Sequence, residues 1–340
     1  MGFLTRLSKE YERVSIVGMA KNAGKTTTLN YLIEEAMDEG IVLGITSTGR
    51  DGETTDLVTG TEKPKVYLDE GTIVSVPVQL YELSSAGLEI LRMTQYSTAL
   101  GQLMLCRVAE SGYVQIAGPV NTADHKKMCG EMMELGAQLI LIDGAVDRRS
   151  IAAPATSDAI ILATGAVLSR NLKKVVEETI HIVRLYQTKR LPEGSLRDKI
   201  TAGASEDKIM VINHGEPQFL DLLTGLAAGK YLDEVIGKET ECVYIPGALT
   251  KGVIGDIHPS KFKDVLFVLK DPTKVFVDAV SWQQLLKKGL RVMVLENIHI
   301  AAITVNPYAP SGYSFAHGEL RAVMQEAAGD IPVMDVKYEA

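Results

Sequence analysis

A strand, a loop and a helix follow one another near the start of the chain. The apolar run Val14–Val17 leads into a loop of small residues, and apolar residues then recur at helical spacing from Thr26 to about Glu39. Gly24, Lys25 and Thr26 stand where the loop meets the expected helix. This order is typical of a phosphate-binding loop, in which backbone N–H groups at a helix N-terminus surround phosphate oxygens.

The rest of the chain repeats the alternation of short apolar runs with helical patterns. We therefore predict an α/β fold of the P-loop NTPase type, with a mostly parallel sheet flanked by helices and a further α/β portion toward the C-terminus. The expected strands include Ile41–Thr46, Thr72–Val76, Leu103–Val108, Val114–Ala117, Leu139–Ile142, Ile160–Ala163, Val265–Leu269, Val292–Leu295 and Ile300–Val305.

A polar stretch at Arg190–Lys208 is the best candidate for a domain boundary. A length of 340 residues indicates about two domains. We predict a nucleotide-binding domain at residues 1–190, a possible linker at 191–208, and a C-terminal α/β portion at 209–340. The alternative, in which the C-terminal portion continues the same sheet, stays open.

The loop residues suit a nucleotide triphosphate. Lys25 would reach the β- and γ-phosphate oxygens, and the Thr26 hydroxyl would ligate Mg²⁺. Gly24 permits a close turn. Five residues separate Gly18 from Gly24, where the common pattern has four, so this departure puts only the role of Gly18 in question. The predicted cofactor-binding residues are Gly18, Asn22, Ala23, Gly24, Lys25, Thr26, Thr27 and Asn306.

A second acidic group is expected at the end of another buried strand. The run Leu139–Gly144 reads LILIDG, with Asp143 directly after four apolar residues. Asp143 would hold Mg²⁺ through water or position the attacking water, because phosphoryl transfer depends on negative groups around the metal. The alternative is an aspartate that only caps a turn.

A polar segment, Thr46–Asp56, follows the second expected strand. Functional groups concentrate in such loops, so Asp51 or Glu53 is expected to ligate the metal or the attacking water, with an ordinary surface turn as the alternative. Together these expectations give Lys25, Asp143 and Glu53 as catalytic residues. They give Thr26, Asp51 and Asp143 as metal ligands.

A third loop, Val305–Phe315, is rich in Pro and Gly and follows a late expected strand. Asn306 would read an adenine edge, and Tyr308 or Tyr313 would stack on the base; a structural turn is the alternative. The sequence has no Asn-Lys-x-Asp motif, so nothing supports guanine specificity. The expected cofactors are therefore ATP and Mg²⁺.

Composition excludes several other classes of protein. The net charge is −8, and no basic stripe indicates nucleic-acid binding. No apolar run approaches the roughly 18 residues that a membrane span needs, so no membrane partner is expected. The three cysteines form no Cys-x-x-Cys pair, which fits a reducing cytoplasm. A homo-oligomer stays possible.

Several motifs together resemble a known family. VSIVGMAKNAGKTTTLNYLIEE, GITSTGRDGETTD, the Lys63-Pro64 turn, LILIDGAVDRR and VNPYAPSGYSF are similar to the small P-loop subunit of the lysine 5,6-aminomutase reactivase. The loop spacing itself resembles that of dethiobiotin synthetase and its relatives. The reactivase resemblance implies an ATP-driven chaperone that lets damaged cobalamin leave an adenosylcobalamin-dependent aminomutase. It also implies a larger partner subunit that resembles mismatch-repair ATPases.

Two other functions fit the same motifs. A dethiobiotin-synthetase-like ligase would use ATP to activate a small carboxylate. A scaffold that binds nucleotide without hydrolysing it would leave Asp143 with a structural role only. Measurement of ADP release with and without a protein partner would distinguish the reactivase, the ligase and the scaffold.

Overall fold

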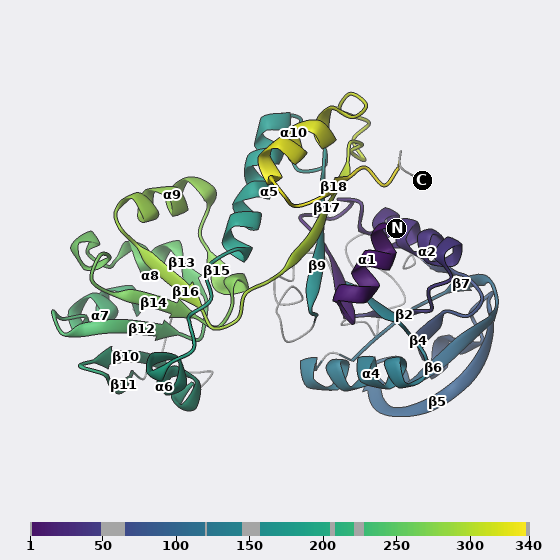
Figure 1. The fold of residues 1–340 in the computed structure, drawn as a ribbon, viewed down its shortest axis with the longest axis horizontal. Helices are drawn as coiled ribbons and strands as arrows, with labels where there is room; N and C mark the ends of the chain where they lie inside the picture. Colours follow the sequence, from purple (N-terminus) through teal and green to yellow (C-terminus); the bar gives the residue numbers. More distant parts are fainter. Residues whose placement is uncertain are drawn as a thin grey trace. The chain divides into compact units, whose positions relative to one another are not determined.

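The computed structural model describes residues 2–48, 65–119, 121–144, 157–204, 208–220 and 228–337. The chain divides into two compact units, and both have a mixed α/β architecture. Unit 1 comprises Met1–Thr179 and His299–Ala340, and unit 2 comprises Ile180–Ile298. The α/β class predicted from the alternation of apolar runs is therefore confirmed (Figure 1).

Unit 1 is built on a nine-stranded sheet with the order β18-β17-β9-β1-β8-β2-β4-β6-β5. The strands from β18 to β4 in that order pair in parallel, whereas β6 and β5 are antiparallel to their neighbours. The sheet is therefore mixed, not purely parallel. Its strands are β1 (Arg13–Gly18), β2 (Leu43–Ser47), β4 (Ile73–Pro77), β5 (Gly87–Thr98), β6 (Gly101–Glu110), β8 (Leu139–Asp143), β9 (Ala159–Gly165), β17 (Ile300–Asn306) and β18 (Val333–Met334). A separate two-stranded sheet joins β3 (Val66–Leu68) to β7 (Gly112–Val114).

Helices cover both faces of the central strands, which explains why these strands are apolar along most of their length. One face packs against α1 (Phe3–Glu10) and α2 (Lys25–Glu39). The other face packs against α4 (Thr122–Glu134), and α5 (Leu172–Tyr186) reaches the same face through a 2.8 Å hydrogen bond between Thr164 and Thr179. Unit 1 also contains the short α3 (Val78–Tyr81) and α10 (Glu319–Ala328).

The ends of two helices follow from their sequence. Gly40 ends α2 with a φ of +67°, a conformation that suits glycine at a helix C-terminus. Asn121 begins α4, because its side chain accepts hydrogen bonds from the backbone N–H groups of Ala123 and Asp124.

The first helix, α1, is held by carboxylates of α2. The Glu39 side chain accepts hydrogen bonds from the backbone N–H groups of Gly2 and Thr5, at 2.8 and 2.9 Å, and Glu35 accepts one from Leu4 at 3.1 Å. Negative charge at a helix N-terminus is stabilising, because it satisfies N–H groups that have no partner within the helix. On its other side α1 buries Leu4 and Leu7 in the core.

Unit 2 has a sheet of its own, with the order β11-β10-β12-β14-β16. Its strands are β10 (Ile209–Asn213), β11 (Glu216–Leu220), β12 (Thr240–Ile245), β14 (Leu266–Leu269) and β16 (Arg291–Val294), and a small pair joins β13 (Leu249–Thr250) to β15 (Val275–Phe276). Its helices are α6 (Ser195–Gly203), α7 (Ala228–Val235), α8 (Lys251–Gly255) and α9 (Ala279–Lys287), with short 3₁₀ turns η2 (Pro259–Lys261) and η3 (Pro272–Lys274).

The division between the units differs from the predicted domains. Strands β17 and β18 return to the sheet of unit 1, so residues 299–340 do not belong with residues 209–298. The predicted linker 191–208 includes α6, which lies within unit 2. Local polarity marks an exposed turn, but it does not show with which sheet the later strands pair.

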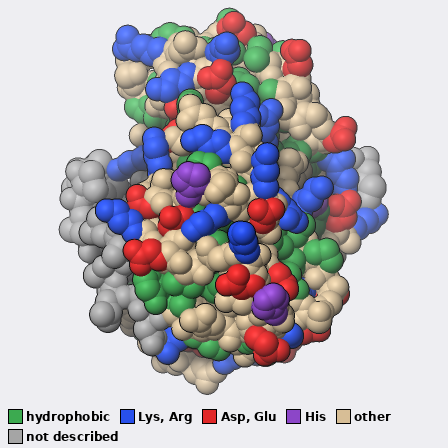
Figure 2. Space-filling model, turned by 90° about the vertical axis from the view of Figure 1, so that its left-hand side faces the viewer, with side chains coloured by type: hydrophobic (Ala, Val, Ile, Leu, Met, Phe, Trp, Pro, Cys, Tyr) green, Lys and Arg blue, Asp and Glu red, His purple; other side chains and the backbone are tan. Residues whose placement is uncertain are grey.

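Positive and negative side chains are both spread over the face of the protein that Figure 2 shows. Within the part of the chain that the structure describes, no helix is long and apolar enough to cross a membrane.

Helix α4 carries a buried histidine. His125 is 1% exposed, and its Nδ1 lies 3.7 Å from the sulfur of Cys129, one helical turn further on. Burial lowers the pKa of His125 to about 4, and the positive charge of Arg13 adds to that shift. The fold therefore holds the neutral form of this imidazole.

We predict that unit 1 loses stability as the pH falls from 7 to 5. The pKa of His125 lies below its ordinary value of 6.5, so its contribution is complete above that value and declines as the pH falls toward 4. At pH 5 the loss amounts to about 2 kcal/mol. Urea unfolding at pH 7 and pH 5 measures it. His125→Gln should reduce the difference, whereas His258→Gln, at an exposed position, should not. An unchanged difference in His125→Gln would contradict the prediction.

Candidate functional site

The candidate site is built around the loop that joins β1 to α2. The loop leaves β1 at Gly18 and is fixed by a 2.9 Å hydrogen bond from the Met19 N–H to the Ala163 carbonyl of β9. Two of its residues adopt a positive φ, Asn22 at +64° and Gly24 at +106°. These left-handed conformations turn the chain sharply into α2.

The first turn of α2 presents backbone N–H groups that no side chain caps. Gly24 occupies the N-cap position and has no side chain to accept from them. The first bond that closes the helix runs from the Thr28 N–H to the Gly24 carbonyl, at 2.9 Å. N–H groups before that point have no partner within the helix, and the helix dipole adds positive potential. An anion is the natural ligand at such a position.

Lys25 points from this turn toward the carboxyl end of β8. Parallel pairing sets Ile16 of β1 opposite Asp143, the last residue of β8. The Lys25 ammonium donates a hydrogen bond to the Gly144 carbonyl, and its Nζ lies 3.8 Å from Oδ1 of Asp143. The side chains of Lys25 and Asp143 are 14% and 33% exposed, so solvent reaches the carboxylate more readily than the ammonium.

Burial acts on both members of this pair. It lowers the pKa of Lys25 and raises the pKa of Asp143, and each residue's charge partly offsets the shift of the other. Both shifts have the same physical cause, which is that ionised groups lose hydration in a partly enclosed site. A ligand that adds opposite charge or hydrogen bonds would therefore stabilise the ionised forms of Lys25 and Asp143.

The end of β2 is tied to the Asp143 backbone. The Ser47 hydroxyl and the Thr48 N–H both donate to the Asp143 carbonyl, each at 3.2 Å. The Thr48 hydroxyl is buried, and among the described residues it has no hydrogen-bond partner. Sequence reasoning did not single out Thr48; its place directly after the second apolar strand was the available signal.

Asn306 reaches the same loop from β17. A Cβ placed on Gly24 would lie 3.1 Å from the Cβ of Asn306, so the two backbones approach closely. The Asn306 carbonyl accepts from the Ala166 N–H at 2.9 Å, and its side-chain Oδ1 accepts from the Tyr308 N–H at 3.1 Å. β17 therefore fixes Asn306 beside the start of α2.

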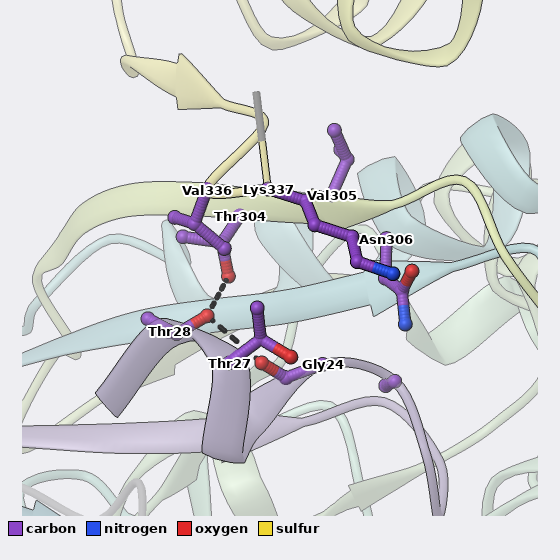
Figure 3. A pocket seen from close by; sticks show the side chains of 9 residues that line it. Gly24, Thr27, Thr28, Thr304, Val305, Asn306, Val336 and Lys337 are labelled. Atoms are coloured by element: carbon purple, nitrogen blue, oxygen red, sulfur yellow. Dashed lines mark hydrogen bonds between the residues drawn. The ribbon is translucent and has the colours of Figure 1, made fainter. Parts of the chain in front are cut away.

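A small open pocket lies between α2 and β17 (Figure 3). A 2.8 Å hydrogen bond between Thr28 and Thr304 crosses it, and the Lys337 side chain runs along it toward Asn306. Sequence reasoning missed Thr304 and Lys337, which are distant from the loop along the chain. Its lining residues are Ala23, Gly24, Thr27, Thr28, Thr304, Val305, Asn306, Val336 and Lys337.

Most of the predicted site residues that the structure describes meet at this edge of the sheet. Thr26 is exposed at the first turn of α2, and a Cβ on Gly18 would lie 3.0 Å from the Lys25 side chain. Asp51 and Glu53 lie outside the described residues, as do Lys63, Pro64, Arg148 and Arg149. Tyr313 is bonded elsewhere, since its hydroxyl donates to the Arg170 carbonyl at 3.0 Å.

Among the described residues, Thr26, Thr48 and Asp143 carry side-chain oxygen atoms at this edge of the sheet. In the described part of the chain, no three or more His, Cys, Asp or Glu side chains gather as a metal site. The arrangement can bind an anion through the α2 amides and Lys25, with Asp143 beside it.

Comparison of the chain with known protein families, with curated proteins and with solved structures found no match.

We predict that Gly24→Ala destabilises unit 1 by about 1–3 kcal/mol, because alanine must adopt a positive φ and also crowds Asn306. Gly40→Ala is the matched control: it has a positive φ at the other end of α2, but nothing lies within 4 Å of the added Cβ. Its cost should be smaller, about 1 kcal/mol. Urea unfolding compares the two. Equal losses would show that the contact with Asn306 imposes no constraint.

Proposed function

We propose that the chain is a P-loop NTPase that binds and hydrolyses Mg·ATP, and that it serves as the small subunit of a reactivase for an adenosylcobalamin-dependent aminomutase. One observation carries the nucleotide proposal. The uncapped first turn of α2, the Lys25 ammonium and the Asp143 carboxylate converge at the carboxyl ends of parallel strands. Ligand sites of α/β sheets lie at that edge.

The phosphate groups would bind along the loop. The N–H groups at the start of α2 would surround them, and Lys25 would exchange its Gly144 carbonyl partner for phosphate oxygens. Such an exchange is favourable because a charged partner restores what burial removes from the ammonium. Asn22 and Gly24 keep the loop backbone close to the ligand.

The residues present fit a magnesium ion bound together with the nucleotide. Thr26 and Thr48 offer hydroxyl oxygens, and the buried Thr48 hydroxyl has no partner among the described residues. Asp143 offers a carboxylate that would hold Mg²⁺ through water. When bound, the ion would neutralise charge on the transferred phosphoryl group.

The site also links the phosphate region to the segment that follows β2. Ser47 and Thr48 both donate to the Asp143 carbonyl, so a shift of Asp143 moves the start of that segment. A nucleotide-driven motor needs two arrangements that its ligand distinguishes. The reactivase proposal names the protein on which this nucleotide-driven change would act. It rests on the sequence motifs that resemble the reactivase subunit. Its partners would be the larger mismatch-repair-ATPase-like subunit and the aminomutase.

We expect Asp143→Asn to retain Mg·ATP while turnover falls at least about tenfold, or ~1.4 kcal/mol of barrier. The amide keeps the shape of the side chain and removes the charge near the metal. Calorimetry measures binding, and ADP release measures turnover. Glu70→Gln, an exposed carboxylate between β3 and β4, is the control. Lys25→Ala should lose binding itself. Native turnover in Asp143→Asn would leave Asp143 with a structural role only.

A second experiment tests the use of the energy. We expect the chain alone to release ADP slowly. Addition of the larger subunit and an aminomutase that holds damaged cobalamin should raise ADP release, and mutase activity should return once intact adenosylcobalamin is supplied. Lys25→Ala should abolish both effects, whereas Lys126→Ala, exposed on α4, should not.

Two other results would contradict the reactivase proposal in different ways. Fast ADP release that depends on a small carboxylic acid, with no response to the mutase, would indicate a ligase. Nucleotide binding without ADP release in any mixture would indicate a scaffold.

A further inference from the structure

Two threonine hydroxyls tie the turn before α2 to strand β17 (Figure 3). The Thr28 hydroxyl, one turn into α2, donates a hydrogen bond to the Gly24 carbonyl at 3.1 Å. Its oxygen also lies 2.8 Å from the hydroxyl oxygen of Thr304 in β17. A hydroxyl has one hydrogen, and Thr28 gives its hydrogen to the carbonyl, so Thr304 is the donor in the second bond. Donation therefore runs from Thr304 to Thr28 to Gly24.

The Gly24 carbonyl accepts two hydrogen bonds from the same residue. The Thr28 N–H donates to it at 2.9 Å, in addition to the Thr28 hydroxyl. Gly24 has a φ of +106° and no side chain, so its own conformational preferences restrict the backbone little. The two bonds to its carbonyl therefore fix the peptide group that joins Gly24 to Lys25.

The orientation of that peptide group determines where the Lys25 N–H points. In a trans peptide the N–H is directed opposite to the C=O. The Gly24 carbonyl points into α2, so the Lys25 N–H points out of the start of the helix, where an anion would bind. Hydrogen bonds in a chain also polarise one another, so a carbonyl that accepts two bonds strengthens the donor on the same peptide.

The sheet places Thr304 where this contact is possible. Thr304 and Thr28 are 3% and 1% exposed, so water does not readily replace either hydroxyl. Parallel pairing of β17 with β9 sets Thr304 opposite Ala163, whose carbonyl accepts the Met19 N–H at the start of the loop. One pair of neighbouring residues in the sheet therefore holds both ends of the loop.

The other face of the same sheet repeats the arrangement without a loop. The Thr179 hydroxyl of α5 donates to the Val175 carbonyl at 2.8 Å, and its oxygen lies 2.8 Å from the hydroxyl of Thr164 in β9. Thr164 and Thr179 are fully buried. Because Val175 lies within α5, and not at its start, these bonds attach a helix to the sheet and orient no free N–H. Thr164 is therefore a matched control for Thr304.

We propose that Thr304 is a positioning residue for the phosphate loop: through Thr28 and the Gly24 carbonyl, it aims the Lys25 N–H at a bound phosphate. The assignment rests on the proposed nucleotide function and adds a residue of β17 to that site. Lys25 then contributes two donors, its side-chain ammonium and its backbone N–H. Only the backbone donor depends on Thr304.

The experiment compares valine variants at the two matched threonines. Calorimetry measures the binding of Mg·ATP and of Mg·tripolyphosphate to the full chain, to Thr304→Val and to Thr164→Val. Valine keeps the shape of threonine and removes the hydroxyl. The affinity of Thr304→Val for both ligands should fall about fivefold, as expected for the loss of one hydrogen bond's contribution. Thr164→Val should bind both ligands like the parent chain.

Further measurements separate positioning from packing. Urea unfolding should show similar losses of stability in the two valine variants, because each removes one buried bond between threonines of unit 1. Without ligand, hydrogen exchange of the Thr28 amide should be faster in Thr304→Val than in Thr164→Val, because its acceptor is held less firmly. Thr304→Ser keeps the hydroxyl and loses a methyl group, and it should restore the affinity of the parent chain.

The outcomes distinguish this assignment from the function on which it depends. Equal affinities in Thr304→Val and Thr164→Val, whether native or reduced, would overturn the role of Thr304 and leave the phosphate site in place. A loss in Thr304→Ser as large as that in Thr304→Val would also overturn it, because the loss would then come from packing. Failure of the parent chain to bind either ligand, or native binding by Lys25→Ala, would overturn the proposed nucleotide function and this assignment together.

Discussion

Backbone pairing of β1 between β8 and β9 fixes the position of every group at the candidate site. Because these strands run parallel, their carboxyl ends meet at one edge. β1 brings the loop, β8 brings Asp143, and β9 both anchors Met19 and pairs with β17, which brings Asn306. The sheet holds these groups in place before a ligand binds, so less conformational entropy is lost on binding.

The pair formed by Lys25 and Asp143 gives the site its electrostatic character. Each group loses hydration on burial. This loss lowers the pKa of Lys25 and raises the pKa of Asp143, so it favours the neutral form of each. At 3.8 Å the attraction between them offsets only part of that loss. A phosphate beside Lys25 would bring the pKa of the ammonium back up, and a cation beside Asp143 would bring the pKa of the carboxylate back down. An anion and a cation that bound together would therefore each restore charge that burial disfavours.

The parts of the fold that sequence reasoning predicted depend on short-range signals. The strand before Gly18 and the helix after Gly24 each follow from residues within a few positions of one another. The central strands were recognisable because burial on both faces makes them apolar throughout. The candidate site was predictable to the same extent, since Asp143 ends such a strand and Lys25 begins the helix that follows another.

The remainder depends on contacts between distant residues. Two glutamates of α2 hold α1, and no pattern within α1 announces that contact. The edge strand β5 is exposed along much of its length, so it lacks the apolar run that marks the inner strands. Lys337 enters the pocket only because β18 pairs with β17, and sheet pairing between remote strands cannot be read from local spacing.

Unit 2 interrupts unit 1 in the chain, and this order has a consequence for how the protein is made. The ribosome releases the whole of unit 2 before β17 and β18 emerge, while the sheet of unit 1 still lacks the neighbour that β9 requires. Unit 2, whose residues are contiguous, can therefore fold during synthesis while unit 1 waits. The wall that carries Asn306 and Lys337 is added last. A nascent chain would thus hold the loop and Lys25 long before it holds Asn306, which lies beside Gly24 in the folded protein.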